Sequence, residues 1–134
     1  MKFSYEILPE KRLIHLRFEG VFTLQELLTG VELMWSDERY RPDYEGIVDL
    51  TDTSVGVDLT DFRALIEFLR NEQRTSKSRW AAVVTTPLAA ACALLYKQAC
   101  AAPHTLEVFS TWEAACRFLK IDLPPDHPLP CYLA

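Results

Sequence analysis

The sequence lacks an excess of basic residues. It has 14 Lys and Arg against 19 Asp and Glu, which gives a formal net charge of −5. Non-specific binding to nucleic acid or to an anionic membrane needs a basic surface, so both kinds of partner are disfavoured. The four cysteines, at 92, 100, 116 and 131, form no CxxC pair. No zinc-finger spacing is present, and reduced thiols in a cytoplasmic protein are expected.

A long uninterrupted apolar run is also missing. The first twenty residues contain Glu6 and Arg17, which break the apolar core that a secretion signal needs. The most apolar window, 81–102, is divided by Pro87 and carries Lys97, so it predicts a strand followed by a helix and no transmembrane segment. With 134 residues, of which 49% are hydrophobic and 25% charged, the chain is typical of one cytoplasmic globular domain.

Hydrophobic periodicity predicts five strands and four helices in the order β-β-α-β-α-β-α-β-α. Strands are expected at 3–7, 13–19, 47–50, 80–85 and 104–109, and helices at 24–36, 59–73, 87–101 and 111–119. The first, third and fourth helices begin with capping signals: Thr23 with Glu26, Thr86 before Pro87, and Ser110 with Glu113. The order predicts an α/β fold with a mixed five-stranded sheet, in which strands two to five are parallel and the first is antiparallel.

The C-terminal segment differs in composition from the rest of the chain. Residues 122–134 include four prolines, which exclude a helix or a central strand. We therefore expect a single domain over residues 1–121 and an extended Pro-rich tail that lies against this domain or a neighbouring chain.

The element order resembles that of the SpoIIAA-like or STAS domains, the fold of the bacterial anti-anti-sigma factors, and most closely their uncharacterised bacterial branch. The resemblance covers residues 3–121. It is carried by Tyr5-Glu6-Ile7 with its Phe18-Glu19-Gly20 exit, Gly46 to Leu50, Asp58 to Phe62, and Val108-Phe109 before a helix with Ala114-Ala115. It implies a regulatory module that works by binding other proteins.

The resemblance also implies one modification site. In the anti-anti-sigma factors the helix after the third strand opens with Asp-Ser-Ser-Gly, and the partner kinase phosphorylates the second Ser. Asp58-Leu59-Thr60-Asp61 matches that stretch here, which makes Thr60 the candidate phosphorylation site. Asp61 replaces the Gly, and a phosphate between Asp58 and Asp61 meets like-charge repulsion despite the favourable helix dipole. The complete regulatory cycle is therefore not expected.

Four carboxylates gather around the end of the third strand: Asp49, Asp52, Asp58 and Asp61. Such a group offers the oxygens that a hard cation prefers, but the spacing is not that of a calcium loop. Helix capping by Asp58, compensation of the helix dipole by Asp61 and a turn at Asp52 account for them structurally. We expect no metal and no cofactor, and an enzyme that uses these carboxylates ranks last among the functions.

The histidines and the third helix complete the set of candidates. His15, on the outward face of its strand, and His127, in the tail, are expected at the surface. The helix over 87–101 is rich in alanine. Its smooth surface fits an interface, a wall that receives a lipid, or close packing on the sheet, and the sequence leaves these alternatives open.

These observations favour a non-catalytic interaction or regulatory module. We expect it to recognise a protein partner through the acidic segment after the third strand and the start of the second helix. The residues expected there are Asp49, Thr51, Asp52, Thr53, Ser54, Asp58 and Thr60. A homodimer is expected as well. The alternative is a carrier for a small molecule or a lipid, in which the third helix lines an apolar cleft. Proteins of this layout are compared with the CRAL-TRIO lipid-transfer proteins.

Overall fold

A mixed sheet forms the centre of the protein, whose computed structural model describes residues 2–55 and 58–133. The strands lie in the order β5-β4-β3-β2-β1-β6. Their bounds are β1 Lys2–Leu8, β2 Leu13–Phe22, β3 Glu45–Val55, β4 Arg79–Val83, β5 Thr105–Phe109 and β6 Cys131–Leu133. β2 to β5 are parallel to one another and β1 is antiparallel to β2, which confirms the predicted directions. The short β6, from the Pro-rich tail, pairs with β1 at the edge of the sheet.

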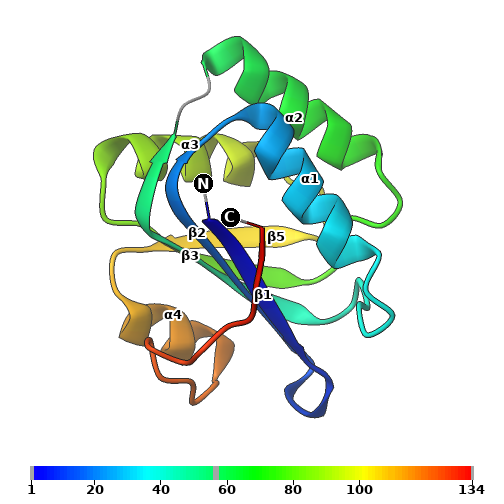
Figure 1. Ribbon diagram of the computed structural model, residues 1–134, viewed down its shortest axis with the longest axis vertical. Helices are drawn as coiled ribbons and strands as arrows, with labels where there is room; N and C mark the ends of the chain where they lie inside the picture. The colour runs from blue at the N-terminus through cyan, green and yellow to red at the C-terminus, as the bar shows by residue number, and fades with distance from the viewer. Residues whose placement is uncertain (1, 56–57, 134) are drawn as a thin grey trace.

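Helices cover both faces of this sheet. They are α1 Leu24–Trp35, α2 Leu59–Asn71, α3 Pro87–Ala99 and α4 Trp112–Leu119, with a short 3-10 turn, η1, at Pro9–Lys11. The first three helices lie on one face, and α4 lies on the other with the segment that leads to β6 (Figure 1). No helix of the described part of the chain has the length and apolar character needed to cross a membrane.

Side-chain caps fix where each helix begins. Thr23 and Glu26 form the predicted capping box of α1, and the hydroxyl of Thr86 accepts the amide of the residue three positions on in α3. The prediction is wrong for α4, because Thr111 rather than Ser110 is its N-cap. In each case a polar side chain accepts an amide that has no partner within the helix.

Strand alternation divides the core into two layers. Leu13 and Ile47 point toward α4, whereas Leu16 and Trp80 point toward α1, α2 and α3. Trp80 of β4 lies directly against β3, since a Cβ atom built on Gly46 would stand 2.2 Å from Cε2 of the indole. Only glycine permits this approach, and the indole therefore forms part of the surface of the sheet under the three helices.

β3 extends well beyond the short apolar run that predicts it. Arg17 of β2 lies opposite Asp49, whereas Glu19 lies opposite Asp52, so β3 holds one extra residue in a β-bulge. The Asp49 carboxylate accepts the amide of Thr51 at 2.9 Å within this bulge. The expectations that this strand ends at residue 50 and that Asp52 lies in a turn are wrong, because the polar residues resume the strand after the bulge and Asp52 pairs with Glu19.

Candidate functional site

The residues predicted to recognise a partner fall into two groups. Thr51, Asp52, Asp58 and Thr60 are exposed, at the end of β3 and the start of α2. Asp49 and Thr53 are buried, with 8% and 3% of their surface exposed, so the expectation that Thr53 belongs to an exposed polar surface is wrong. The Ser54 side chain lies outside the described part of the structure.

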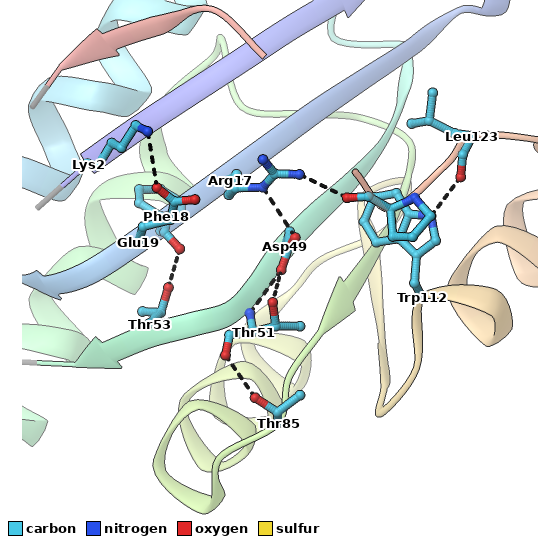
Figure 2. A network of polar contacts seen from close by, with 11 residues as sticks. Lys2, Arg17, Phe18, Glu19, Asp49, Thr51, Thr53, Thr85, Trp112 and Leu123 are labelled. Atoms are coloured by element: carbon cyan, nitrogen blue, oxygen red, sulfur yellow. Dashed lines mark hydrogen bonds and ion pairs between the residues drawn. The ribbon is translucent and has the colours of Figure 1, made fainter. Parts of the chain in front are cut away.

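Internal contacts explain why the two buried residues are polar. Asp49 forms an ion pair with Arg17, at 3.3 Å between Oδ2 and Nε, and it accepts the Thr51 hydroxyl at 2.6 Å. The Thr53 hydroxyl donates to the carbonyl of Phe18. Figure 2 shows these contacts running across β2 and β3, with Arg17 reaching toward the tail. They stabilise the bulge and leave these two side chains little freedom to meet another protein.

Asp58 has the structural role that the sequence predicts. Its carboxylate accepts the Asp61 amide at 2.8 Å as the N-cap of α2. Thr60 follows in the first turn and is exposed. The start of α2 is thus a capped helix end with an accessible hydroxyl, which neither supports nor removes the prediction that Thr60 is phosphorylated.

His15 is buried, which contradicts its predicted surface position. None of its surface is exposed, and neither ring nitrogen has a hydrogen-bond partner among the described atoms. Its ring packs 5.2 Å from that of Trp112 and 6.0 Å from that of His127, in the layer under α4 and the tail. Burial, aided by the positive charge of Arg17, lowers the pKa of His15 from 6.5 to about 4, so the imidazole is neutral at pH 7.

The tail is fastened over this layer by several contacts. Arg17 donates to the carbonyl of Pro125 at 3.0 Å, the Trp112 indole donates to that of Leu123 at 2.7 Å, and His127 pairs with Glu6. His127 is therefore partly buried rather than a plain surface residue. The contacts on this face hold the tail against the sheet and have a structural role. Within residues 2–55 and 58–133, no group of three or more potential metal ligands occurs.

An apolar cavity of about 190 Å³ lies on the opposite face, between the sheet and helices α1, α2 and α3. The sheet provides its floor and the three helices its walls. Its apolar lining includes Leu16, Leu27, Val48, Phe62, Leu65, Trp80, Ala82, Ala89, Ala93 and Leu106. No Asp, Glu, Lys or Arg lines it among the described residues. The third helix therefore does line an apolar cavity, which is one of the alternatives that its alanine-rich sequence leaves open.

The cavity exists because small residues face one another across it. Ala82 of β4 and Ala89 and Ala93 of α3 are all buried and line the same space. A methyl group in place of a larger side chain leaves volume that the neighbouring backbone does not close. The resulting space is large enough for a small ring, since an engineered apolar cavity of about 150 Å³ in another protein binds benzene.

Polar groups on the cavity wall bond to one another. The Tyr96 hydroxyl lies 2.9 Å from Nε2 of His104, whose Nδ1 lies 3.0 Å from the carbonyl of Ser78. A carbonyl only accepts, so Nδ1 carries the hydrogen and Nε2 accepts from Tyr96. Burial lowers the pKa of His104, which keeps the ring neutral. The Thr75 hydroxyl likewise donates to the Leu69 carbonyl at 2.6 Å.

Trp80 differs from these residues because its polar atom has no hydrogen-bond partner in the described part of the protein. Only 7% of its surface is exposed, and its Nε1 is buried without an acceptor among the described protein atoms. A buried donor left unpaired costs about 1–3 kcal/mol. Trp80 thus contributes to the apolar lining of the cavity, while its indole N–H is buried and is satisfied by no described protein group.

Comparison with known proteins identifies the fold. A protein of the DUF3478 family from Shewanella loihica PV-4, uncharacterised and described as having a SpoIIAA-like fold, superposes with a TM-score of 0.58. The match covers 89% of this chain and 95% of the other, at 13% sequence identity. The chain therefore has a SpoIIAA-like fold. This confirms the resemblance inferred from the order of elements. No protein-family model matches the sequence, and the comparison with curated proteins found no significant match.

Proposed function

We propose that this SpoIIAA-like protein is a non-catalytic binding protein that takes a small, mostly apolar molecule into the cavity under α1, α2 and α3. The observation that supports the proposal most strongly is the cavity itself, with about 190 Å³ of space and an almost entirely apolar wall. Ligand sites are concave and mostly apolar, with a few polar groups that fix orientation. The volume suits a ligand of one or two rings rather than a two-chain lipid.

The decisive experiment measures binding together with its location. Isothermal titration calorimetry with α-methylstyrene tests the wild type, Ala93→Phe and Ala91→Phe. Ala93 lines the cavity, whereas Ala91 is exposed on the same helix, so the two variants add the same ring to opposite sides of α3. We expect saturable binding by the wild type and Ala91→Phe, and at least a tenfold loss in Ala93→Phe because its ring occupies the ligand volume.

Two results would contradict the proposal. One is the absence of heat and of thermal stabilisation in the wild type up to the solubility limit of the ligand. The other is equal binding by Ala93→Phe, which would place the ligand elsewhere. A ligand at ten times its Kd raises the free energy of unfolding by about 1.4 kcal/mol, so melting curves provide an independent check.

Recognition of a protein partner is a second candidate function. It is favoured by the exposure of Thr51, Asp52 and Thr60 at one end of the molecule. Of these residues, Thr60 lies in the first turn of α2, and Phe62 and Leu65 of the same helix line the cavity. We infer that a partner seated there contacts a helix whose packing depends on what fills the cavity.

The charge at Asp52 gives this second candidate its test. A partner captured by the wild type from native lysate should be lost with Asp52→Lys and retained with Glu10→Lys, since Glu10 is exposed in η1, a different part of the surface. Equal capture by all three proteins would argue against this surface. Light scattering on the purified protein separately tests the expected homodimer.

A further inference from the structure

A second cavity, of about 310 Å³, lies between the C-terminal ends of α2 and α3. Its wall comes from the last turns of these two helices and from the segments that follow them, over residues 72–77 and 100–104. The lining mixes charged, hydroxyl and apolar side chains, whereas the cavity over the sheet is apolar almost throughout. We call the second space the polar cavity and the first the apolar cavity.

The two cavities adjoin each other. Five of the described residues line both of them: Leu69, Thr75, Ser76, Tyr96 and His104. Tyr96 and His104 are joined by the hydrogen bond of 2.9 Å between the hydroxyl and Nε2. The same residues therefore bound both spaces, so a molecule in the apolar cavity comes within the length of a short chain of polar surroundings.

The charges that line the polar cavity cancel. Among the described residues they are two acids and two bases, Glu67, Glu72, Arg70 and Lys77. Glu67 lies 3.9 Å from Arg70, and Glu72 pairs with Arg74 at 3.1 Å. Both helices end at this cavity, and a helix C-terminus carries partial negative charge and carbonyls without a partner in the helix. These surroundings favour a neutral group with hydrogen-bond donors over a carboxylate.

We propose that the apolar and polar cavities form one divided ligand site and that the ligand is a small neutral amphiphile. Its ring fills the apolar cavity, and a short hydroxylated chain attached to the ring lies in the polar cavity. This inference rests on the proposed function, because it requires that the apolar cavity takes up a ligand. The apolar half then supplies the hydrophobic contact, and the polar half selects the group that the ring carries.

Two positions on α3 separate the halves of this site. Ala93 lines the apolar cavity, and Ala99, at the end of the same helix, lines the polar cavity. Isothermal titration calorimetry measures the Kd values of phenyl glyceryl ether and α-methylstyrene for the wild type, Ala93→Phe and Ala99→Phe. Ala91→Phe is the control, because Ala91 is exposed. α-Methylstyrene carries no hydroxylated chain, so it reports on the apolar cavity alone.

The two variants should affect the two ligands differently. Ala93→Phe should weaken both ligands about tenfold or more, because its ring fills the apolar cavity. Ala99→Phe should weaken phenyl glyceryl ether about five- to tenfold, the loss of one hydrogen bond, and leave α-methylstyrene within about twofold of the wild type. The carboxylate β-phenoxypropanoate, which has the same number of heavy atoms as phenyl glyceryl ether, should bind the wild type about fivefold more weakly or worse, because its charge loses water.

Three results would overturn these inferences. An unchanged Kd of phenyl glyceryl ether in Ala99→Phe would overturn the role of the polar cavity and leave the proposed function standing. Binding of β-phenoxypropanoate as tight as that of phenyl glyceryl ether would overturn the neutral class of ligand in the same way. Binding of neither phenyl glyceryl ether nor α-methylstyrene by the wild type would overturn the proposed function as well.

Two native thiols test the placement of the ligand without any variant. Cys92 lines the apolar cavity and Cys100 lines the polar cavity. Burial raises the pKa of both thiols, so their modification by iodoacetamide is followed at mildly alkaline pH by mass spectrometry. Phenyl glyceryl ether should slow the reaction of both thiols, α-methylstyrene that of Cys92 alone, and neither ligand that of Cys116 in α4. Protection of Cys92 but not of Cys100 by phenyl glyceryl ether would overturn the proposed position of its chain.

Discussion

The buried His15 predicts a specific loss of stability in mild acid. The pKa of His15 is about 4 in the folded protein and 6.5 in the unfolded chain, because burial disfavours the charged ring. Between these two values the unfolded chain binds a proton that the folded protein does not. The contribution of the neutral His15 to the free energy of unfolding is therefore fully present above pH 6.5 and is lost as the pH falls toward 4. The difference of 2.5 pH units, at about 1.36 kcal/mol each, amounts to about 3 kcal/mol.

Urea denaturation between pH 7.5 and pH 4, followed by tryptophan fluorescence, measures this loss. His15→Leu should flatten the pH dependence, because leucine cannot bind a proton. It should also be at least as stable as the wild type near pH 5, since it removes two buried nitrogens that have no partner among the described atoms. A smaller slope should remain, because burial lowers the pKa of His104 in the same direction.

Two outcomes would refute the reasoning about His15. If His15→Leu kept the full loss of stability between pH 6.5 and 4, the proton responsible would bind elsewhere. If the variant unfolded at pH 7.5, the imidazole would be making a contact that its buried position beside Trp112 does not indicate.

Three further predictions concern single positions. Gly46→Ala should lower the free energy of unfolding by about 1–3 kcal/mol or displace Trp80, because the new Cβ atom would overlap the indole; urea denaturation measures the loss. Asp49→Asn should cost about 2 kcal/mol in the same assay, because Arg17 loses its ion partner in a largely buried position. Cys92 lines the cavity and burial raises its thiol pKa, so iodoacetamide should modify it slowly at pH 7 and more slowly with α-methylstyrene bound.

Each of these predictions has a control. The control for Gly46→Ala is Ser36→Ala, at an exposed helix end, which should change the free energy of unfolding little. Gly20→Ala is unsuitable, because Gly20 has a φ of 85° that alanine rarely adopts. Asp52→Asn is the control for Asp49→Asn, because Asp52 is exposed. Cys116, in α4 on the far side of the sheet, is the control thiol. Equal ligand protection of both thiols would contradict the location of the site.

The order of the elements along the chain can be predicted from the sequence because each element carries its own periodicity or cap. The strand directions follow from that order, because a helix between two strands implies a parallel crossover. The end of β3 cannot be predicted, because its apolar pattern stops at the bulge. At the bulge the strand is stabilised by hydrogen bonds from Thr51 to Asp49, and these leave no apolar pattern in the sequence. A run of Asp, Thr and Ser therefore has the composition of a loop, although its backbone remains paired with β2.

The position of His15 escapes prediction for a related reason. It alternates with Ile14 and Leu16, which indicates a polar outer face when only one face of a strand is considered. The tail and α4 cover that face, and their contribution comes from residues about a hundred positions away, such as Trp112. Packing of the tail and α4 on this face does not change the alternation of apolar and polar residues in β2, so that alternation cannot predict it.

The cavity illustrates a different limit. The alanine-rich helix indicates an apolar wall, but the space depends on Ala82 of β4 facing Ala89 and Ala93 of α3. Nothing in the sequence pairs these positions. The unpaired indole of Trp80 depends in turn on its place against Gly46, which is a property of the register between β3 and β4.

The central claim, that the cavity takes up a small apolar ligand, is tested most directly by methyl-resolved NMR during a titration with α-methylstyrene. We predict saturable shifts for Leu16, Leu27 and Leu65, which line the cavity, and no shift for Leu13 and Ile47 on the opposite face of the sheet. Cavity methyl signals that stay unchanged at the solubility limit, or shifts restricted to exposed methyl groups, would contradict the account.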